Sequence, residues 1–239
     1  MPFDVSGSKT RTRYKAEIQR VSPPSRRQSY DEHDRCFLGV SLENSNFTPG
    51  KLASMLVWIS RRFSDCTVLI GDSIHRITLE STRSLSGEAA LTEAIRLGDE
   101  FVENTREIFA SQRENTSFTF LRCSDVQQWD GYGEHHRYLR KYYETDAEFR
   151  ESVDSFGRGY HAKRSLGVEA TEMDRRVSRS SDYFLEEFAV FACLEERGIP
   201  VMVYPGSFST LAEIAAGTHP DAPEELRRLI VVSLHLKGR

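Results

Sequence analysis

The stretch between residues 35 and 71 alternates between two short apolar runs and one longer amphipathic segment. The pattern predicts a strand over 35–41, a helix over 49–64 and a short buried strand over 67–71. Two strands joined by a helix form a βαβ unit, whose crossover is almost always right-handed. The chain is therefore expected to build a parallel sheet that helices cover.

The remainder of the chain extends this plan. Ser86 followed by Glu88 is typical of a helix start, and residues 117–122 alternate as a strand does. The elements predicted beyond residue 71 are a helix over 86–112, a strand over 117–122, helices over 134–197 with a break around 165–167, and strands over 201–204 and 229–234. We therefore expect an α/β fold: a Rossmann-like, five-stranded, mostly parallel sheet flanked by helices.

Length and charge give the expected domain organisation. A chain of 239 residues is long enough for one substantial core, and its net charge of −4 is not that of a globally basic protein. The first thirty residues are nevertheless rich in Lys and Arg and poor in large apolar groups. We expect residues 1–30 to be a basic, flexible arm that cannot fold alone, and residues 31–239 to be a single Rossmann-like catalytic domain.

Several classes of protein and of site are not expected. No apolar run approaches the ~20 residues that cross a bilayer, which favours a cytoplasmic protein without a membrane partner. The four cysteines, Cys36, Cys66, Cys123 and Cys193, are widely scattered and lack CxxC spacing. They are predicted to be reduced core residues, and neither a metal site nor a disulfide framework is expected.

Ser41 stands where the first predicted strand ends and a polar turn begins. In open parallel sheets the ligand crevice lies beyond the carboxyl ends of the strands, so a hydroxyl placed there faces substrate. Ser41 is thus a candidate nucleophile. The simpler alternative is that it serves as a turn or helix-capping residue.

Two further segments carry candidate proton-handling groups. Tyr183 and Glu187 are four residues apart on a predicted helix, so both side chains emerge on one face. Tyr204 ends an apolar strand before Pro205-Gly206, which places its phenol at the same sheet edge as Ser41. The alternatives are an exposed Glu187 beside Glu186, and a Tyr204 that only packs its ring.

Together these residues resemble the tRNA-dependent cyclodipeptide synthases. The family's hydrophobic-Gly-hydrophobic-Ser-x-x-Asn-Ser motif is matched by Leu38 to Ser45, its Tyr-x-x-x-Glu by Tyr183 to Glu187, and its strand-ending tyrosine by Tyr204. A further family tyrosine aligns with Tyr132 when Asp146-Ala147-Glu148-Phe149 is the anchor. The resemblance covers about residues 35–235.

The resemblance implies a fold, a reaction and a set of roles. The fold would be like the catalytic domain of class I aminoacyl-tRNA synthetases, but no HIGH-like or KMSKS-like sequence occurs, so ATP activation is not expected. Two aminoacyl-tRNAs per product would form a 2,5-diketopiperazine by ping-pong acyl transfer, without a cofactor, through aminoacyl and dipeptidyl esters of Ser41. Asn44 would help to stabilise oxyanion charge, and Glu187 with Tyr183 would hold the α-amino group and take a proton from the second amine. Tyr204 would relay a proton, and Tyr132 would orient the amine or shape the pocket.

The resemblance also gives expectations for the pocket and for the tRNA surface. The pocket residues expected are Phe37, Gly39, Leu185, Phe188 and Ser207, and the bulk of Phe37 favours a small first residue. The helix after the second strand is basic in described family members, but here residues 88–113 are rich in acidic side chains. The tRNA contacts are therefore expected at Arg26, Arg27, Arg175 and Arg176.

Some alternatives remain open at this point. Asn44 is typical of one branch of the family and the Tyr204-Pro205 pair of another, so the branch is undecided. A non-catalytic RNA-binding or tRNA-binding Rossmann-like protein would also use the basic segments. A serine hydrolase is less favoured, because Glu43 stands where the Gly-x-Ser-x-Gly elbow needs glycine. The chain is expected to be a monomer that does not bind DNA, and the two amino acids are not indicated.

Overall fold

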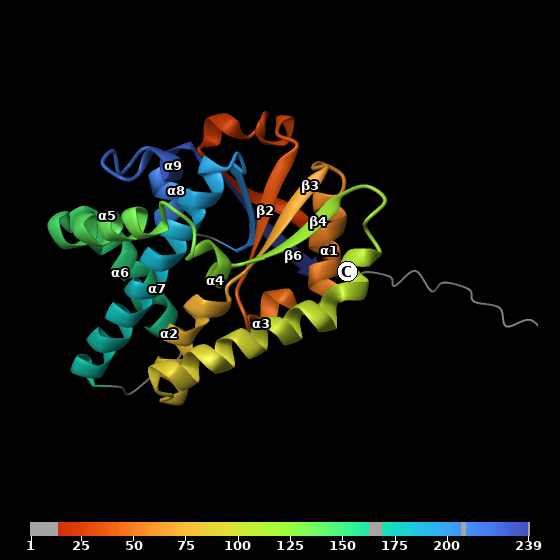
Figure 1. Ribbon diagram of the computed structural model, residues 1–239. Coiled ribbons are helices and arrows are strands. Elements are labelled where there is room, and N and C mark those ends of the chain that lie inside the picture. The colour runs from red at the N-terminus through yellow and green to blue at the C-terminus, as the bar shows by residue number, and fades with distance from the viewer. Residues whose placement is uncertain (1–13, 163–168, 207–208, 239) are drawn as a thin grey trace, which may run out of the picture.

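A mixed sheet of six strands forms the centre of the protein in a computed structural model, which describes residues 14–162, 169–206 and 209–238 (Figure 1). The strand order is β1-β6-β5-β2-β3-β4. The strands are β1 (Tyr14–Ser22), β2 (Arg35–Val40), β3 (Asp65–Ile70), β4 (Ser117–Arg122), β5 (Val201–Pro205) and β6 (Ile230–Gly238). Strands β2 to β6 pair in parallel, and β1 runs antiparallel to β6. The predicted α/β fold is confirmed, with six strands instead of five.

Helices cover both faces of this sheet. One face packs against α1 (Pro49–Ile59) and α3 (Gly87–Ala110), and the other against the helices of the second half of the chain (Figure 1). The remaining helices are α2 (Asp72–Arg83), α4 (Cys123–Val126), α5 (Tyr132–Thr145), α6 (Ala147–Ala162), α7 (Ala170–Glu196), α8 (Ser209–Ala215) and α9 (Glu224–Arg228). Burial on both faces explains why β2 and β3 are almost wholly apolar.

The described part of the expected N-terminal arm belongs to the sheet, so that prediction is wrong for residues 14–30. Residues 14–22 form β1, which pairs with β6 along its whole length, and Tyr30 stacks on Trp58 with ring centroids 6.0 Å apart. A strand at a sheet edge keeps one face in water and tolerates Lys and Arg. A basic strand of this kind resembles a disordered arm when only its own composition is considered.

The helical region between β4 and β5 differs in detail from its prediction. Among the described residues, the short helix α4 and the longer helices α5, α6 and α7 occupy it. Asp146 separates α5 from α6, and its carboxylate accepts the Phe149 N–H at 2.7 Å, as a helix cap does. The break expected around 165–167 lies outside the described residues. Within the described ranges, no helix is both long and apolar enough to span a membrane.

Candidate active site

Ser41 and Tyr204 meet at the carboxyl edge of the sheet, as the sequence predicts. Ser41 follows β2, Tyr204 lies in β5, and these two strands are hydrogen-bonded neighbours. The Ser41 hydroxyl lies 3.0 Å from the Tyr204 hydroxyl, and Asn44 Nδ2 donates to the same phenol at 3.2 Å. The three residues therefore share one hydrogen-bonded group at the place where an open sheet presents its ligands.

Helix α7 brings Tyr183 and Glu187 to the same place. Tyr183 also hydrogen-bonds Ser41, so the serine hydroxyl lies between two phenols. Burial, with the nearby Glu187 carboxylate, raises the pKa of Tyr183 well above its usual value, and this phenol stays protonated at neutral pH. In the parts of the chain that the structure describes, Ser41 has these phenols and no histidine as partners, unlike the serine of a hydrolase triad.

Glu187 is a buried carboxylic acid with an unsatisfied oxygen. Its exposed fraction is 7 %, and its Oε2 atom has no hydrogen-bond partner among the described residues. Burial raises the pKa of Glu187 to about 8. The alternative of an exposed glutamate is therefore wrong. A carboxylate in this setting gains most from a cationic ligand, which would supply its missing partner.

A cavity of about 610 Å³ joins these groups. Its walls come from the loop after β2, from α2, and from α6 and α7. The residues that line it include Ser41, Glu43, Asn44, His75, Ile77, Thr78, Arg83, Phe156, Arg179, Tyr183, Phe184, Glu187 and Tyr204. The volume falls within the ~300–1,000 Å³ typical of small-ligand pockets.

The loop that carries Ser41 is fixed to its surroundings by side-chain contacts. Asn44 Oδ1 accepts the Asn46 N–H at 3.0 Å and caps the short helix Ser45–Phe47, while Asn46 Nδ2 donates to the Pro205 carbonyl at 3.2 Å. The Phe47 ring packs on Tyr204 with centroids 6.0 Å apart. The loop and β5 thus hold the serine and the tyrosine in register.

Tyr132 is not among the residues that line the cavity. Gln127 Nε2 donates to the Tyr132 hydroxyl at 3.3 Å and to Glu186 at 3.1 Å, and the Tyr132 ring stacks on His136. Burial raises the pKa of Tyr132 above its ordinary range. These contacts connect Tyr132 to α7 outside the lining of the cavity. Its expected role in orienting a substrate amine stays a prediction.

The predicted pocket residues lie elsewhere. Phe37, Leu185 and Phe188 are fully buried in the core, where Phe37 packs against Phe191. A methyl group added at Gly39 would lie 3.7 Å from the Tyr204 ring and 3.6 Å from Met202, in ordinary contact. None of these four lines the described cavity, and their role as walls of a substrate pocket stays a prediction. Ser207 lies outside the described residues.

Helix α2, which the sequence patterns do not predict, supplies further contacts around the site. Arg76 binds the Glu186 carboxylate with two hydrogen bonds of 2.8 and 2.5 Å, and His75 Nε2 lies 3.1 Å from Glu43. Glu186 is only 8 % exposed, so this ion pair is partly buried. Only the Asp72 acidic start hinted at this helix, because its Ile and Thr residues are β-branched and lower helix propensity.

The two arginine pairs expected to bind tRNA lie at opposite ends of the molecule. Arg26 and Arg27 are exposed and precede β2, so they stand at the amino edge of the parallel strands, away from Ser41 (Figure 1). Arg175 and Arg176 lie on α7, and both approach Glu172, at 3.8 and 2.9 Å. The two pairs do not form one surface.

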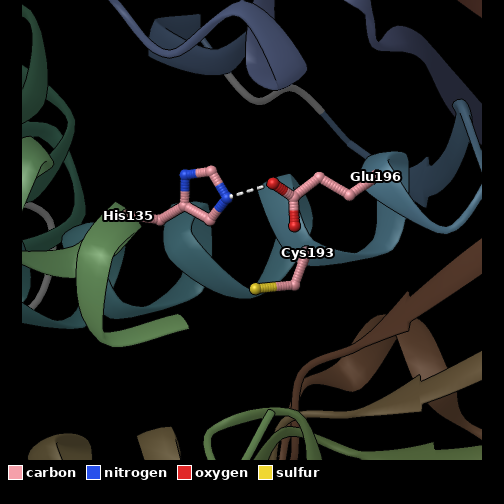
Figure 2. A group of neighbouring side chains, drawn as sticks. All are labelled: His135, Cys193 and Glu196. Atoms are coloured by element: carbon pink, nitrogen blue, oxygen red, sulfur yellow. Dashed lines mark hydrogen bonds and ion pairs between the residues drawn. The ribbon is translucent and has the colours of Figure 1, made fainter. Parts of the chain in front are cut away.

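A group of three potential metal ligands in the described segments lies apart from the cavity. The donor atoms of His135, Cys193 and Glu196 are within 4.8 Å of one another (Figure 2). His135 Nε2 forms a 3.0 Å contact with Glu196, and burial raises the pKa of Cys193 to about 11. A protonated thiol is a poor metal ligand, and the His135–Glu196 contact accounts for the geometry. All four cysteines are free and buried, as predicted.

Comparisons with known proteins agree with this architecture. The family described as "Cyclodipeptide synthase" matches residues 22–193. A search of curated proteins finds no match.

Solved structures give the same fold. A cyclodipeptide synthase from Fluoribacter dumoffii superposes with a TM-score of 0.80 at 21 % identity, covering 95 % of this chain and 100 % of that one. One from Candidatus Glomeribacter gigasporarum, bound to Phe-tRNAPhe, gives 0.64 at 17 % identity over 85 % of this chain and 88 % of that one. A Mycobacterium tuberculosis protein, whose structure is described as relating cyclodipeptide synthetases to type I tRNA synthetases, gives 0.65 at 18 % identity, covering 95 % and 94 %.

Proposed function

Because the chain belongs to the cyclodipeptide synthase family, we propose that it joins two aminoacyl groups, each delivered on a tRNA, into a 2,5-diketopiperazine. One observation carries this proposal beyond the family. The Ser41 hydroxyl, held between two phenols, shares a cavity with the buried Glu187 carboxylate, whose Oε2 has no partner among the described residues. This arrangement suits an amino acid ester. Its carbonyl needs a nucleophile, which the serine supplies, and its ammonium group needs a counter-charge, which the carboxylate supplies.

In the first step the Ser41 oxygen attacks the ester carbonyl of the first aminoacyl-tRNA. A bond forms between Oγ and the carbonyl carbon, and the bond from that carbon to the ribose oxygen breaks. The serine proton passes through the Tyr204 hydroxyl, 3.0 Å away, to the departing ribose oxygen. A phenol whose pKa is near 10 is a weak base, so Tyr204 relays the proton and does not retain it.

Glu187 then serves the amine of the residue bound to Ser41. If the dipeptide is to stay on the serine, the attacking amine must belong to the first residue, and the carbonyl to the second aminoacyl-tRNA. Glu187 therefore holds the first ammonium and takes one proton from it, which later passes to solvent. The proton that the nitrogen loses as the amide forms goes to the second ribose oxygen as it leaves. This differs from the expectation that Glu187 takes a proton from the second, incoming amine.

Ring closure regenerates the free serine. The amine of the second residue attacks the seryl ester, a second peptide bond forms, and the bond between the carbonyl carbon and Oγ breaks. Tyr204 returns a proton to Ser41, and the cyclic product leaves. Two esters are exchanged for two amides, so no ATP or other cofactor is needed to balance the reaction.

Asn44 acts on this relay through Tyr204. Its Nδ2 donates to the phenol oxygen at 3.2 Å and its Oδ1 accepts from Asn46 at 3.0 Å, so the amide is fixed in orientation. We assign Asn44 to orienting the Tyr204 hydroxyl instead of to the oxyanion. Tyr132, through Gln127 and Glu186, supports α7 from behind.

Expression of the chain in a bacterium tests the proposal. Mass spectrometry of the culture medium is expected to show a diketopiperazine that is absent from cells expressing Ser41→Ala. With purified protein and a full set of charged tRNAs, the wild type is expected to gain the mass of one aminoacyl group. Absence of both the ring and the adduct from the wild type would reject the proposal.

A tRNA-binding protein without catalysis is the second candidate, because the chain shares its fold with a structure bound to Phe-tRNAPhe. The same experiment separates the two functions. A binding protein would retain labelled aminoacyl-tRNA equally well in the wild type and in Ser41→Ala, and it would form no ester in either.

A further inference from the structure

Glu43 has an unusual backbone conformation at a sensitive position. It stands two residues after Ser41 and directly before Asn44, and its φ is +57°. A residue with a branched or long side chain adopts this left-handed region at a cost of about 1 kcal/mol. Glycine or asparagine would fit with less strain, so a contact of the glutamate side chain must offset the cost.

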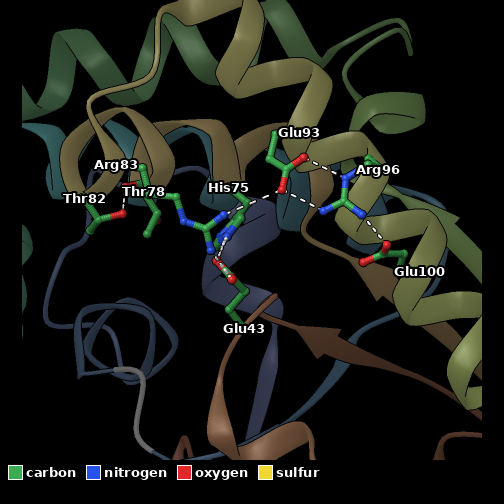
Figure 3. Close-up of polar contacts among 8 residues, drawn as sticks. All are labelled: Glu43, His75, Thr78, Thr82, Arg83, Glu93, Arg96 and Glu100. Carbon is green, nitrogen blue, oxygen red and sulfur yellow. Dashed lines mark hydrogen bonds and ion pairs between the residues drawn. The ribbon is translucent and has the colours of Figure 1, made fainter.

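The Glu43 carboxylate bridges two residues of α2. One oxygen lies 3.1 Å from His75 Nε2, and the other binds the Arg83 guanidinium (Figure 3). The His75 side chain is only 6 % exposed, and burial lowers the pKa of His75 despite the opposing effect of Glu43. His75 is therefore neutral at neutral pH and donates its Nε2–H to the carboxylate.

Arg83 is itself held from the other side. Its guanidinium lies 3.6 Å from Glu93 on α3, and Glu93 binds Arg96 with two hydrogen bonds of 2.7 Å (Figure 3). Arg96 also binds Glu100. The serine loop is thus the end of a row of ion pairs that crosses from α2 to α3.

Helix α2 is also joined to the helix that carries Glu187. Arg76 on α2 binds Glu186 on α7, and Arg179 on α7 binds Glu80 on α2. Arg179 also lines the cavity. Helix α2 thus contacts both the serine loop and the helix that carries Glu187.

We infer that Glu43 is a positioning residue, which fixes Ser41 and Asn44 relative to Tyr204 and Glu187 by binding the serine loop to His75 and Arg83. The inference rests on the proposed function. Misplacement of a reacting group by ~1 Å costs on the order of 100-fold in rate. Because Glu43 and Arg83 are both about two-fifths exposed, their ion pair contributes little to overall stability.

Two variants and one control test the inference. Glu43→Gln keeps the length of the side chain without its charge, and Glu43→Asn suits the left-handed backbone but is one methylene too short to reach His75 and Arg83. Glu103→Gln is the matched control, since it removes an exposed carboxylate from an ion pair with Arg106 on α3, outside the row that reaches the serine loop. For each protein, the rate of seryl ester formation at saturating aminoacyl-tRNA, the KM and the Tm are measured.

We expect Glu43→Asn to lower the maximal rate of seryl ester formation by roughly 10- to 100-fold, with KM within about 3-fold of the wild type and an unchanged Tm. Glu43→Gln should be intermediate, and Glu103→Gln should match the wild type. A wild-type rate for Glu43→Asn, a rise in KM alone, or a rate loss that follows a fall in Tm would each overturn the inference. Absence of ester in the wild type would instead count against the proposed function.

Discussion

Glu187 is the residue whose environment departs furthest from that of an ordinary side chain of its type. A buried carboxyl group without a partner is costly in its charged form, and proteins keep such groups mainly where a ligand completes them. Here the completing group is expected to be the ammonium of an amino acid ester. The raised pKa then gives two measurable consequences, one in stability and one in activity.

The stability of the protein should depend on the ionisation of Glu187. Its pKa is about 8 in the folded protein and 4.5 in a solvated carboxyl, so between these pH values the folded state holds a proton that the unfolded state releases. Stability therefore falls as pH rises through this window. The Glu187→Gln variant should not show this loss. The difference in Tm between the variant and the wild type should therefore change by about 10 °C from pH 5 to pH 9.

Thermal unfolding curves across that pH range check this prediction. Glu114→Gln, at an exposed position, serves as the control and should follow the wild type. The wild-type kcat/KM should rise with pH and level off above about 8, as Glu187 ionises. Equal pH dependence of Tm in the wild type and Glu187→Gln would show that the carboxyl is not buried as described.

Tyr204→Phe removes the hydroxyl that contacts both Ser41 and Asn44 while keeping the ring. We expect kcat to fall by roughly 10²- to 10⁴-fold, because the proton relay that serves the first acylation and ring closure is lost, and the aminoacyl ester of Ser41 should form correspondingly slowly. Mass spectrometry of the intact protein detects that species. Tyr138→Phe, at an exposed phenol bonded to the Asp221 carbonyl, is the matched control. Normal turnover by Tyr204→Phe would remove the phenol from the mechanism.

Among the elements, α2 is the one on which the site geometry depends most. Arg76→Met leaves the Glu186 carboxylate buried without its bidentate partner, which should destabilise the fold by about 2–4 kcal/mol. Urea unfolding measures the change. The paired change Arg76→Met with Glu186→Leu should recover most of it, since no charge remains buried.

The control for this prediction is Arg106→Met, which breaks a pair with Glu103 on α3. Both of those side chains are about two-thirds exposed, so the cost should be below about 1 kcal/mol. A similar cost for Arg76→Met and Arg106→Met would mean that the α2–α7 pair does not hold the helices together.

The same elements show what sequence patterns predict well. Residues 117–122 form a strand with the predicted bounds, and Ser86 caps α3, because alternation and capping are local signals. Helix α2 was missed because Ile74, Ile77 and Thr78 weaken its helical pattern. Strand β1 was missed because its partner, β6, lies about two hundred residues away in the chain, where no local signal reaches.

The candidate site was predicted in the same uneven way. Ser41, Tyr183, Glu187 and Tyr204 lie together because strand ends and helix faces follow from periodicity. The support of the site comes from ion pairs between distant segments, Glu43 with Arg83 and Arg76 with Glu186. No spacing in the sequence indicates such pairs.

At the scale of the whole molecule, the position of the arginines decides where tRNA can lie. Arg175 and Arg176 are about two turns, or ~10 Å, along α7 from Tyr183. Arg26 and Arg27 lie at the opposite edge of the sheet. We therefore propose that the tRNA backbone passes Arg175 and Arg176, and that it does not reach Arg26 and Arg27.

Charge reversal tests this placement. Arg175→Glu with Arg176→Glu should weaken tRNA binding and reduce the slope of log affinity against log salt by roughly 1.5–2, as expected for two lost phosphate contacts. Arg26→Glu with Arg27→Glu is the matched control and should leave both quantities unchanged. Filter binding over a range of salt concentrations measures them. An effect of the control pair alone would reverse the assignment.

The size of the cavity has a kinetic consequence. About 610 Å³ accommodates two linked residues, but it cannot seat the terminal nucleotides of two carriers at once. Under the proposed reaction, the discharged tRNA of the first half-reaction would therefore depart before the second aminoacyl-tRNA binds. Uncharged tRNA would then compete for the vacated space, and the output of the enzyme would follow the ratio of charged to uncharged tRNA.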